Sequence, residues 1–366
     1  MGSASEETFK PERIFKKPGF AETLYLGTAG GRRIIRKLSK PDALPFSRTA
    51  LVREIRLLSD LPEPLKPFYP ELIRTNLPNR GEGTTGLPDI IWYDMPYYAP
   101  EDGWATLSDL FLAGTIGRDN AHRVLAEIAE VSFTAFRLDA REPDGDYAER
   151  TMLAAIRDSL AWAVVRDEFS ALMEIRGMRV NGIPVPGIVD LSDRFIDSIE
   201  TRELLTPGRD RFLHGDFFPE NILYNTRTGR WLLMDPVSVR GVHRGDFMLD
   251  VYKMEQWLSG ELPALRNGAF SMSISGNEVS LDIYTGEGNL ANLRSLELID
   301  AWHNLMRSPS FADIFAEEPG WEEHRAFIAA FYAFCMLPLA DMRQAQVRYV
   351  LALKAMGEFE GMVSNL

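Results

Sequence analysis

The sequence predicts an α+β fold of two domains, a small one of mainly antiparallel strands followed by a larger one of mainly helices. Three observations predict it. The chain has 366 residues, which at roughly 150 residues per domain corresponds to about two folding units. Its first part contains short β-prone runs separated by Gly and Pro, whereas apolar residues at helical spacing dominate the remainder.

Three β-prone runs open the small domain. They cover residues 13–15, 23–26 and 33–38 and are separated by turn residues, which predicts a three-stranded meander. Apolar residues then recur at helical spacing from Leu51 to Leu58, and the prolines that follow end this helix. A further strand is expected over Leu87 to Trp92.

The break near Asp94 to Tyr98 is the predicted domain boundary, which divides the chain into residues 1–95 and 96–366. Beyond it, a helix is expected to open near Arg118, and Met152 to Met173 carries a comparable pattern. Small hairpins are expected at 178–185 and 270–284. Several packed helices are expected from Ser295 to the end of the chain.

The composition excludes several classes of protein. The 40 basic and 53 acidic residues give a formal charge of −13, the reverse of the basic excess that a nucleic-acid binder needs. The longest apolar stretch, Phe327 to Ala340, contains Pro338 and is shorter than the roughly 20 residues that cross a bilayer. Neither nucleic acid nor a membrane is therefore an expected partner.

The N-terminus and the cysteine content indicate a compartment. The first residues lack the apolar core of a signal peptide. The single cysteine, Cys335, forms no internal disulfide and supplies no cysteine-based zinc site. We expect a cytoplasmic protein.

The segment from Arg211 to Asp250 carries the clearest chemistry. A short strand leads into a loop over 214–221, and two strands joined by a turn follow it. This hairpin returns the chain to its start, so Asp235 is expected beside Asn221, with Asp216 close to both. One carboxylate and one amide oxygen suit Mg²⁺, which also takes oxygens from water and phosphate. Asp216 then remains to receive the proton of a hydroxyl group.

Three motifs in this segment carry a resemblance to a known family. They are HGDxxxxN at 214–221, Asp235-Pro236, and GDxxxD at 245–250. In this order and spacing the segment resembles the aminoglycoside phosphotransferase and choline kinase family of small-molecule kinases. The resemblance implies a two-lobed protein-kinase-like fold, in which residues 1–95 bind the nucleotide and residues 96–366 form the catalytic and acceptor-binding lobe.

The resemblance extends to a lysine in the small domain. Lys37 is similar to the family lysine that holds the nucleotide phosphates, and Glu54 is similar to its ion-pair partner. A nearby carboxylate would keep the ammonium group charged and oriented. Arg36 is a competing choice, but alternation from Ile35 places Lys37 on the face expected to line the cleft.

Four further positions are implied to contact the nucleotide. Gly19 and Ala21 lie in the run that resembles the phosphate-covering loop, although this run offers one glycine where relatives often have two. Met95 and Tyr97 lie where the family's lobes meet and are expected to line the base pocket.

Three other residues are implied to support the site. His214 has two interpretations, a catalytic base or a structural residue that fixes the loop, and its spacing favours the structural one. Asp246 and Asp250 resemble family positions that brace the active-site loops.

Other nucleotide-binding motifs are rejected. Residues 81–86 satisfy GxGxxG, but they lead into a β-prone run rather than opening a helix, so no dinucleotide site is expected. A Walker A motif is absent from the sequence. His214 is followed by Gly rather than Arg, and Asp235 by Pro rather than Phe-Gly, so a protein acceptor is disfavoured.

The sequence therefore predicts an ATP- or GTP-dependent, magnesium-dependent phosphotransferase that acts on a hydroxyl of a small molecule. An aminoglycoside, an amino sugar, a sugar and a choline-like amine all remain open as the acceptor. An acidic run beside Trp321 suits a cation or is a solvated helix face; it comprises Asp313, Glu317, Glu318, Glu322 and Glu323. The alternatives are a nucleotide-binding pseudokinase scaffold and an enzyme of the same fold that transfers AMP.

Overall fold

The computed structural model describes residues 9–15, 22–40, 46–78, 87–237, 243–283 and 290–364. The chain forms two compact units. The first comprises residues 1–109 and 214–243, and the second comprises residues 110–213 and 244–366.

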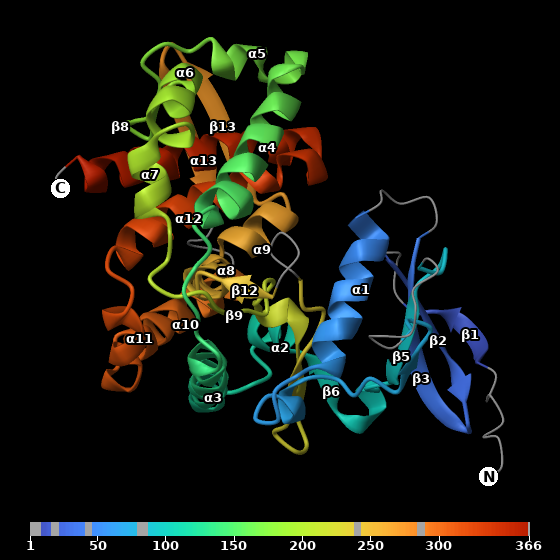
Figure 1. Ribbon diagram of the computed structural model, residues 1–366. Helices are drawn as coiled ribbons and strands as arrows, with labels where there is room; N and C mark the ends of the chain where they lie inside the picture. The colour runs from blue at the N-terminus through green and yellow to red at the C-terminus, as the bar shows by residue number, and fades with distance from the viewer. Residues whose placement is uncertain are drawn as a thin grey trace. The chain divides into compact units, whose positions relative to one another are not determined.

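The first unit contains the predicted meander within a five-stranded antiparallel sheet. Its order is β1-β2-β3-β5-β4, with β1 at Lys10–Ile14, β2 at Glu22–Ala29, β3 at Arg32–Ser39, β4 at Arg74–Thr75 and β5 at Trp92–Pro96. Helix α1 (Phe46–Ser59) packs on β3 beside this sheet (Figure 1). Ile35, Leu51 and Ile55 are buried, as expected for an apolar helix face that covers a sheet.

The strand expected over Leu87 to Trp92 is wrong in its bounds. β5 starts at Trp92, and Leu87 and Ile90 are each 41% exposed. The partner strand sets this limit, because the ladder between β3 and β5 ends where Leu38 pairs with Trp92. Ahead of it, the Ser39 amide still donates to the Ile91 carbonyl, but the Ile91 amide donates to the Ser39 hydroxyl, and this side-chain contact ends the regular ladder.

A second sheet of the first unit holds the predicted hairpin. Strands β10 (Ile222–Asn225) and β11 (Trp231–Leu233) pair antiparallel, with Ile222 opposite Leu233. β10 also pairs with β6 (Trp104–Thr106). These pairings are the reason that residues 96–109 and 214–243 belong to the same unit as the meander. The predicted division at residue 95 into nucleotide and acceptor lobes concerns binding, and it stays a prediction.

The second unit is dominated by helices, as expected. They are α3 (Arg118–Arg137), α4 (Ala154–Val164), α5 (Asp167–Met173), α6 (Ile188–Leu191), α7 (Ile199–Leu204), α8 (Met248–Leu258), α9 (Glu261–Arg266), α10 (Leu290–Met306), α11 (Ala312–Ala316), α12 (Trp321–Cys335) and α13 (Met342–Val363). α2 (Leu107–Ala113) bridges the two units in the sequence. α12 is central, since it packs against α4, α8 and α13 (Figure 1). In the part of the chain that the structure describes, none of the helices has the length and apolarity to cross a membrane.

Both predicted hairpin insertions are confirmed, and they join in one sheet of the second unit. Its order is β13-β14-β7-β8, with β7 at Arg179–Val180, β8 at Ile183–Pro184, β13 at Phe270–Ser275 and β14 at Glu278–Ile283. Asn181 connects the hairpins, because its side chain donates to the Leu281 carbonyl and accepts from the Leu281 amide. A separate two-stranded sheet pairs β9 (Arg211–Phe212) with β12 (Arg244–Gly245).

Candidate functional site

Lys37 is the buried cation at the centre of the first unit. It lies on β3 and is 3% exposed. Its Nζ donates to Oε1 and Oε2 of Glu54, on α1, at 3.0 and 2.9 Å. The Tyr93 hydroxyl donates to Glu54 Oε1 at 2.7 Å. The predicted pairing of Lys37 with Glu54 is therefore present in the structure.

The choice between Arg36 and Lys37 follows from strand alternation. Arg36 projects from the opposite face of β3, where its guanidinium contacts both carboxylate oxygens of Asp94 at 2.7 and 2.9 Å. The same guanidinium lies 3.8 Å from the ring centroid of Trp92. Because successive side chains of a strand point to opposite faces, Arg36 is committed to a different cluster.

Asp235 extends the Lys37 cluster toward solvent. It lies two residues after the end of β11, and its Oδ1 accepts from Lys37 Nζ at 3.0 Å. Its side chain is 38% exposed, compared with 4% for that of Lys37. Its φ of 53° lies in the left-handed region, which Asp and Asn tolerate better than other residues with a side chain.

Asn221 lies between Asp216 and Asp235. Its side-chain nitrogen donates to Asp216 Oδ2 and to the Asp216 carbonyl, both at 2.9 Å. The amide of Met234, next to Asp235, donates to the Asn221 carbonyl at 2.7 Å. One continuous series of contacts thus joins Asp216, Asn221, Asp235 and Lys37, as the hairpin geometry predicted.

Gly215 permits the backbone path into this loop. Its φ is 85°, and a Cβ atom at this position would lie 1.8 Å from the Val237 carbonyl oxygen. The Val237 amide in turn donates to the His214 carbonyl at 2.9 Å. Any side chain at residue 215 would therefore push apart the two segments that carry Asp216 and Asp235.

The charges of this cluster are unbalanced. Burial opposes the charge on Lys37, but Asp235 and Glu54 outweigh it and raise the pKa of this lysine well above its usual value. Burial raises the pKa of Glu54 to about 7, although Lys37 acts in the opposite direction. Glu22 also lies 3.7 Å from Lys37 Nζ. Several carboxyl groups thus surround one ammonium group, a setting that suits a divalent cation.

Asn221 and Asp235 fit a magnesium ion. Because the Asn221 side-chain nitrogen is the donor to Asp216, its oxygen is the atom left to act as a ligand. Asp235 adds a carboxylate that reaches solvent, and phosphate oxygens and water complete the usual coordination of Mg²⁺. Over the described residues, no group of three or more His, Cys, Asp or Glu is arranged to hold a metal.

The surroundings of His214 support the structural interpretation. The side chain is buried, and its Nδ1 accepts from the Asp216 amide at 3.3 Å. Burial lowers the pKa of His214 to about 4, although Asp216 acts in the opposite direction. A neutral imidazole that accepts from the loop backbone fixes the loop before Asp216.

Four further residues were predicted to contact the nucleotide, and the structure describes two of them. Met95 is buried in β5 opposite Ile35. Tyr97 follows β5, and its ring contacts that of Phe15 edge to face at 5.3 Å. Gly19 and Ala21 lie outside the described residues.

Asp246 and Asp250 belong to the second unit, where both are buried. Asp246 Oδ2 lies 2.7 Å from His324 Nδ1, and its Oδ1 accepts from the Met248 amide at 2.8 Å. Asp250 lies in the first turn of α8. Within the second unit, the contacts of Asp246 hold the start of α8. That Asp246 and Asp250 brace the active-site loops stays a prediction.

Sequence reasoning missed two residues. Tyr93 contacts Glu54, and His324 contacts Asp246. The sequence signal for Tyr93 was its alternation with Met95, which was obscured because β5 was placed too early. His324 lies 78 positions from Asp246, so no local pattern connects the two.

The acidic run beside Trp321 is not one solvated face. Asp313 pairs with Arg137, which lowers the pKa of Asp313 to about 2. Glu317 pairs with Arg211, whereas Glu318 is fully buried. The run is therefore divided among separate contacts of the second unit.

The chain resembles known proteins at the level of family and fold. The sequence model of the phosphotransferase enzyme family matches residues 19–235. A protein of Ralstonia eutropha JMP134, provisionally named an aminoglycoside phosphotransferase, shares 11% identity and a TM-score of 0.52 over 98% of this chain and 94% of that one. The streptomycin–ATP complex of APH(2")-IIa shares 10% identity and a TM-score of 0.47 over 97% and 94%. No curated protein matches the sequence.

Proposed function

Because this chain belongs to the phosphotransferase enzyme family, whose model matches residues 19–235, we propose that it transfers the γ-phosphoryl group of ATP or GTP to a hydroxyl of a small molecule. The observation that carries the proposal is the continuous series of contacts from Asp216 through Asn221 and Asp235 to Lys37. Phosphoryl transfer depends mainly on positioning and on neutralising phosphate charge, and these groups supply both.

Each residue of the series has a proposed role. The ammonium group of Lys37, oriented by Glu54, would hold the nucleotide phosphates. Asn221 and Asp235 would hold Mg²⁺, which neutralises phosphate charge when bound. Asp216 would orient the acceptor hydroxyl and take its proton as the acceptor oxygen bonds to the γ-phosphorus. The bond between that phosphorus and the β–γ bridging oxygen breaks, and the nucleoside diphosphate leaves with the electron pair.

The acceptor is expected to be an aminoglycoside, an amino sugar, a sugar or a choline-like amine. The experiment is to incubate the protein with Mg²⁺, a mixture of these compounds, and either ATP or GTP, and to analyse the products by mass spectrometry. We expect one compound to gain the mass of one phosphate group, with an equal amount of nucleoside diphosphate. Asp235→Asn should abolish the gain, whereas Asp282→Asn, an exposed aspartate of the second unit, should retain it.

Two other results would overturn the proposal. A gain of the mass of AMP would assign the chain to nucleotidyl transfer on the same fold. Nucleotide binding without any product across the mixture would favour a pseudokinase scaffold.

The role of Asp216 has its own test. General-base help accounts for about 10²- to 10⁴-fold of a rate, so Asp216→Asn should lower kcat by at least about 10²-fold while nucleotide binding is retained. A kcat within tenfold of the unmodified protein would show that Asp216 is not the base.

A further inference from the structure

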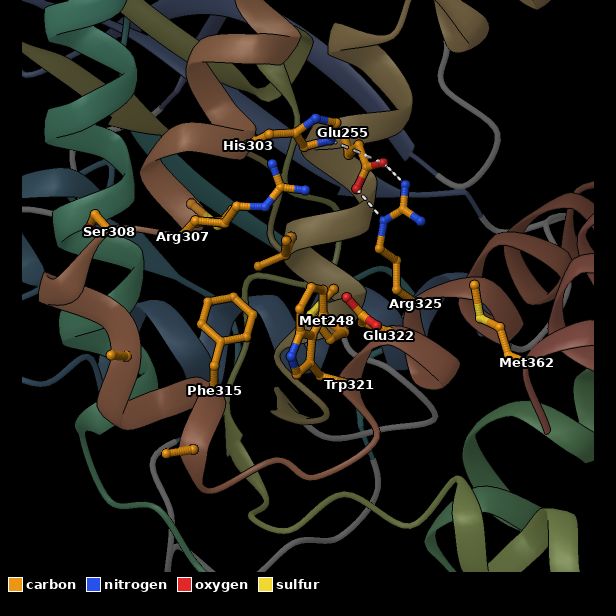
Figure 2. Close-up of a pocket in the computed structure, with 14 residues that line it drawn as sticks. Met248, Glu255, His303, Arg307, Ser308, Phe315, Trp321, Glu322, Arg325 and Met362 are labelled. Atoms are coloured by element: carbon orange, nitrogen blue, oxygen red, sulfur yellow. Dashed lines mark hydrogen bonds and ion pairs between the residues drawn. The ribbon is translucent and has the colours of Figure 1, made fainter. Parts of the chain in front are cut away.

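The second unit contains a cavity of about 710 Å³ between α8, α10, α11 and α12 (Figure 2). Cavities of roughly 300–1,000 Å³ are typical of small-molecule sites. All of its lining residues belong to the second unit, and none is among the residues proposed for phosphoryl transfer. The cavity is therefore a candidate site within the second unit.

An aromatic pair forms part of its wall. The rings of Phe315 and Trp321 meet edge to face, with centroids 5.0 Å apart. Figure 2 shows them next to each other, on α11 and α12. Met248 and Met306 add polarizable side chains to the same lining. Such a surface favours a flat apolar body.

Glu255 is already neutralised by its neighbours. It is 7% exposed, and Arg325 contacts both of its carboxylate oxygens, with Nε at 2.8 Å from Oε2. His303 Nε2 lies 3.4 Å from Oε1 (Figure 2). Burial acts to raise the pKa of Glu255, but Arg325 and His303 together outweigh it, and the pKa stays below its usual value. This carboxylate is ionised and paired, so it does not favour a cationic ligand.

Arg307 is the second arginine of the cavity lining. Among the described residues, no side-chain hydrogen bond or ion pair engages its guanidinium group. His303 lies one turn before it in the sequence, and Arg325 lines the same cavity. Arg325 is paired with Glu255, so Arg307 is the arginine of this lining that has no carboxylate partner among the described residues. A guanidinium group binds a carboxylate through two parallel hydrogen bonds.

Glu322 is the other carboxylate in the cavity lining, and its position weakens the effect of its negative charge on Arg307. It lies beside Trp321 in the first turn of α12 (Figure 2), where the positive end of the helix dipole offsets part of a negative charge. Arg307 and Glu322 form no ion pair with each other in this part of the structure. The guanidinium group of Arg307 is therefore available to a ligand in the cavity.

We propose that this cavity binds a small organic acid, with a flat apolar body against Phe315 and Trp321 and its carboxylate on Arg307. Of the two interpretations of the acidic run beside Trp321, a cation site and a solvated helix face, this proposal follows neither. The acidic residues of that run are mostly paired with arginines or buried, whereas three basic side chains line the cavity.

The proposal is tested by calorimetric titration of the whole protein, without nucleotide, with 3-phenylpropanoate, its neutral amide and its amine. We expect the acid to bind at least tenfold more tightly than the amide, and the amine not to bind. Arg307→Gln should weaken binding of the acid by about tenfold or more, because it removes a charge-assisted hydrogen-bonded pair. Arg176→Gln removes the same charge from an exposed position elsewhere in this unit and should change nothing.

Three results would overturn the proposal: equal binding of acid and amide, tighter binding of the amine, or no binding of the acid up to its solubility limit. Loss of acid binding in Trp321→Leu, with an unchanged thermal midpoint, would support it. Since no nucleotide or turnover enters the measurement, failure of the proposed phosphotransferase activity leaves this test intact.

Discussion

Each unit of the molecule buries a cluster of charged side chains, and the two clusters differ in how far they open to solvent. In the first unit, the buried pair of Lys37 and Glu54 continues to Asp235, whose side chain is 38% exposed. In the second unit, the side chains of Asp246, His324 and Glu318 are each at most 1% exposed. The first cluster is therefore able to exchange ligands, whereas the second can only hold the fold together.

The closed cluster, made of Asp246, His324 and Glu318, surrounds one imidazole with acceptors. His324 Nδ1 lies 2.7 Å from Asp246 Oδ2, and its Nε2 lies 2.6 Å from the Leu204 carbonyl. Two acceptors require a proton on both ring nitrogens. Burial opposes this charge, but Asp246 outweighs it and raises the pKa of His324 to about 9. In the open cluster, made of Lys37, Glu54 and Asp235, the carboxyl groups likewise outnumber the cation, but the side chain of Asp235 reaches solvent.

The largest effect on activity is expected from a substitution that breaks the open cluster. Asp235→Asn should lower kcat/KM by about 10³-fold, the scale of a lost electrostatic contact in a transition state, while the free energy of unfolding changes by less than about 1 kcal/mol. Asparagine tolerates the left-handed backbone at this position. Steady-state kinetics and denaturant unfolding measure the two quantities. A large loss of stability with retained activity would show that this cluster is structural too.

The next effect breaks the closed cluster. His324→Gln should lower the free energy of unfolding by about 3 kcal/mol, because it leaves Asp246 buried without its cation. Since the pKa of His324 is raised on folding, the loss should be full below about pH 6.5 and shrink as the pH rises toward about 9. Denaturant midpoints at several pH values measure it. A loss that grows with pH would contradict a charged His324.

A smaller effect on stability is expected at Arg36, and it distinguishes this residue from its neighbour Lys37. Arg36→Lys should cost about 2 kcal/mol of stability, because it removes the two-pronged contact with Asp94 and the contact with Trp92. Asp94 keeps Arg74, which bonds to its Oδ2, so the loss is partial. Turnover should stay within about threefold, whereas Lys37→Arg should nearly abolish it. Equal losses of turnover would show that the two faces of β3 are not independent.

The smallest effect is expected from a substitution that shifts the pKa of Glu54 in the open cluster. Tyr93→Phe removes the hydroxyl that donates to Glu54, which should cost about 1 kcal/mol. That hydrogen bond lowers the pKa of Glu54, so its loss should raise this pKa further. The acidic limb of the pH–rate profile should move to higher pH. An unchanged limb would show that Glu54 does not control it.

Local patterns in the sequence were sufficient for much of the fold and for the core of the site. The meander, α1, α3 and the hairpin of β10 and β11 each follow from spacing within a short segment. The grouping of Asp216, Asn221 and Asp235 follows from that hairpin, since an antiparallel pair returns to its start. The start of β5 was wrong because a hydrogen bond to the Ser39 hydroxyl replaces the regular ladder before Trp92, and Ser39 lies far away in the sequence.

The sequence by itself determined the class of fold, the residues around Asp216 and the choice of Lys37 over Arg36, because alternation along a strand and return through a hairpin are local geometry. The tertiary structure decided the contacts of Tyr93 with Glu54 and of His324 with Asp246. Such contacts join residues from distant segments, and their energies depend on burial, which only the packed chain defines.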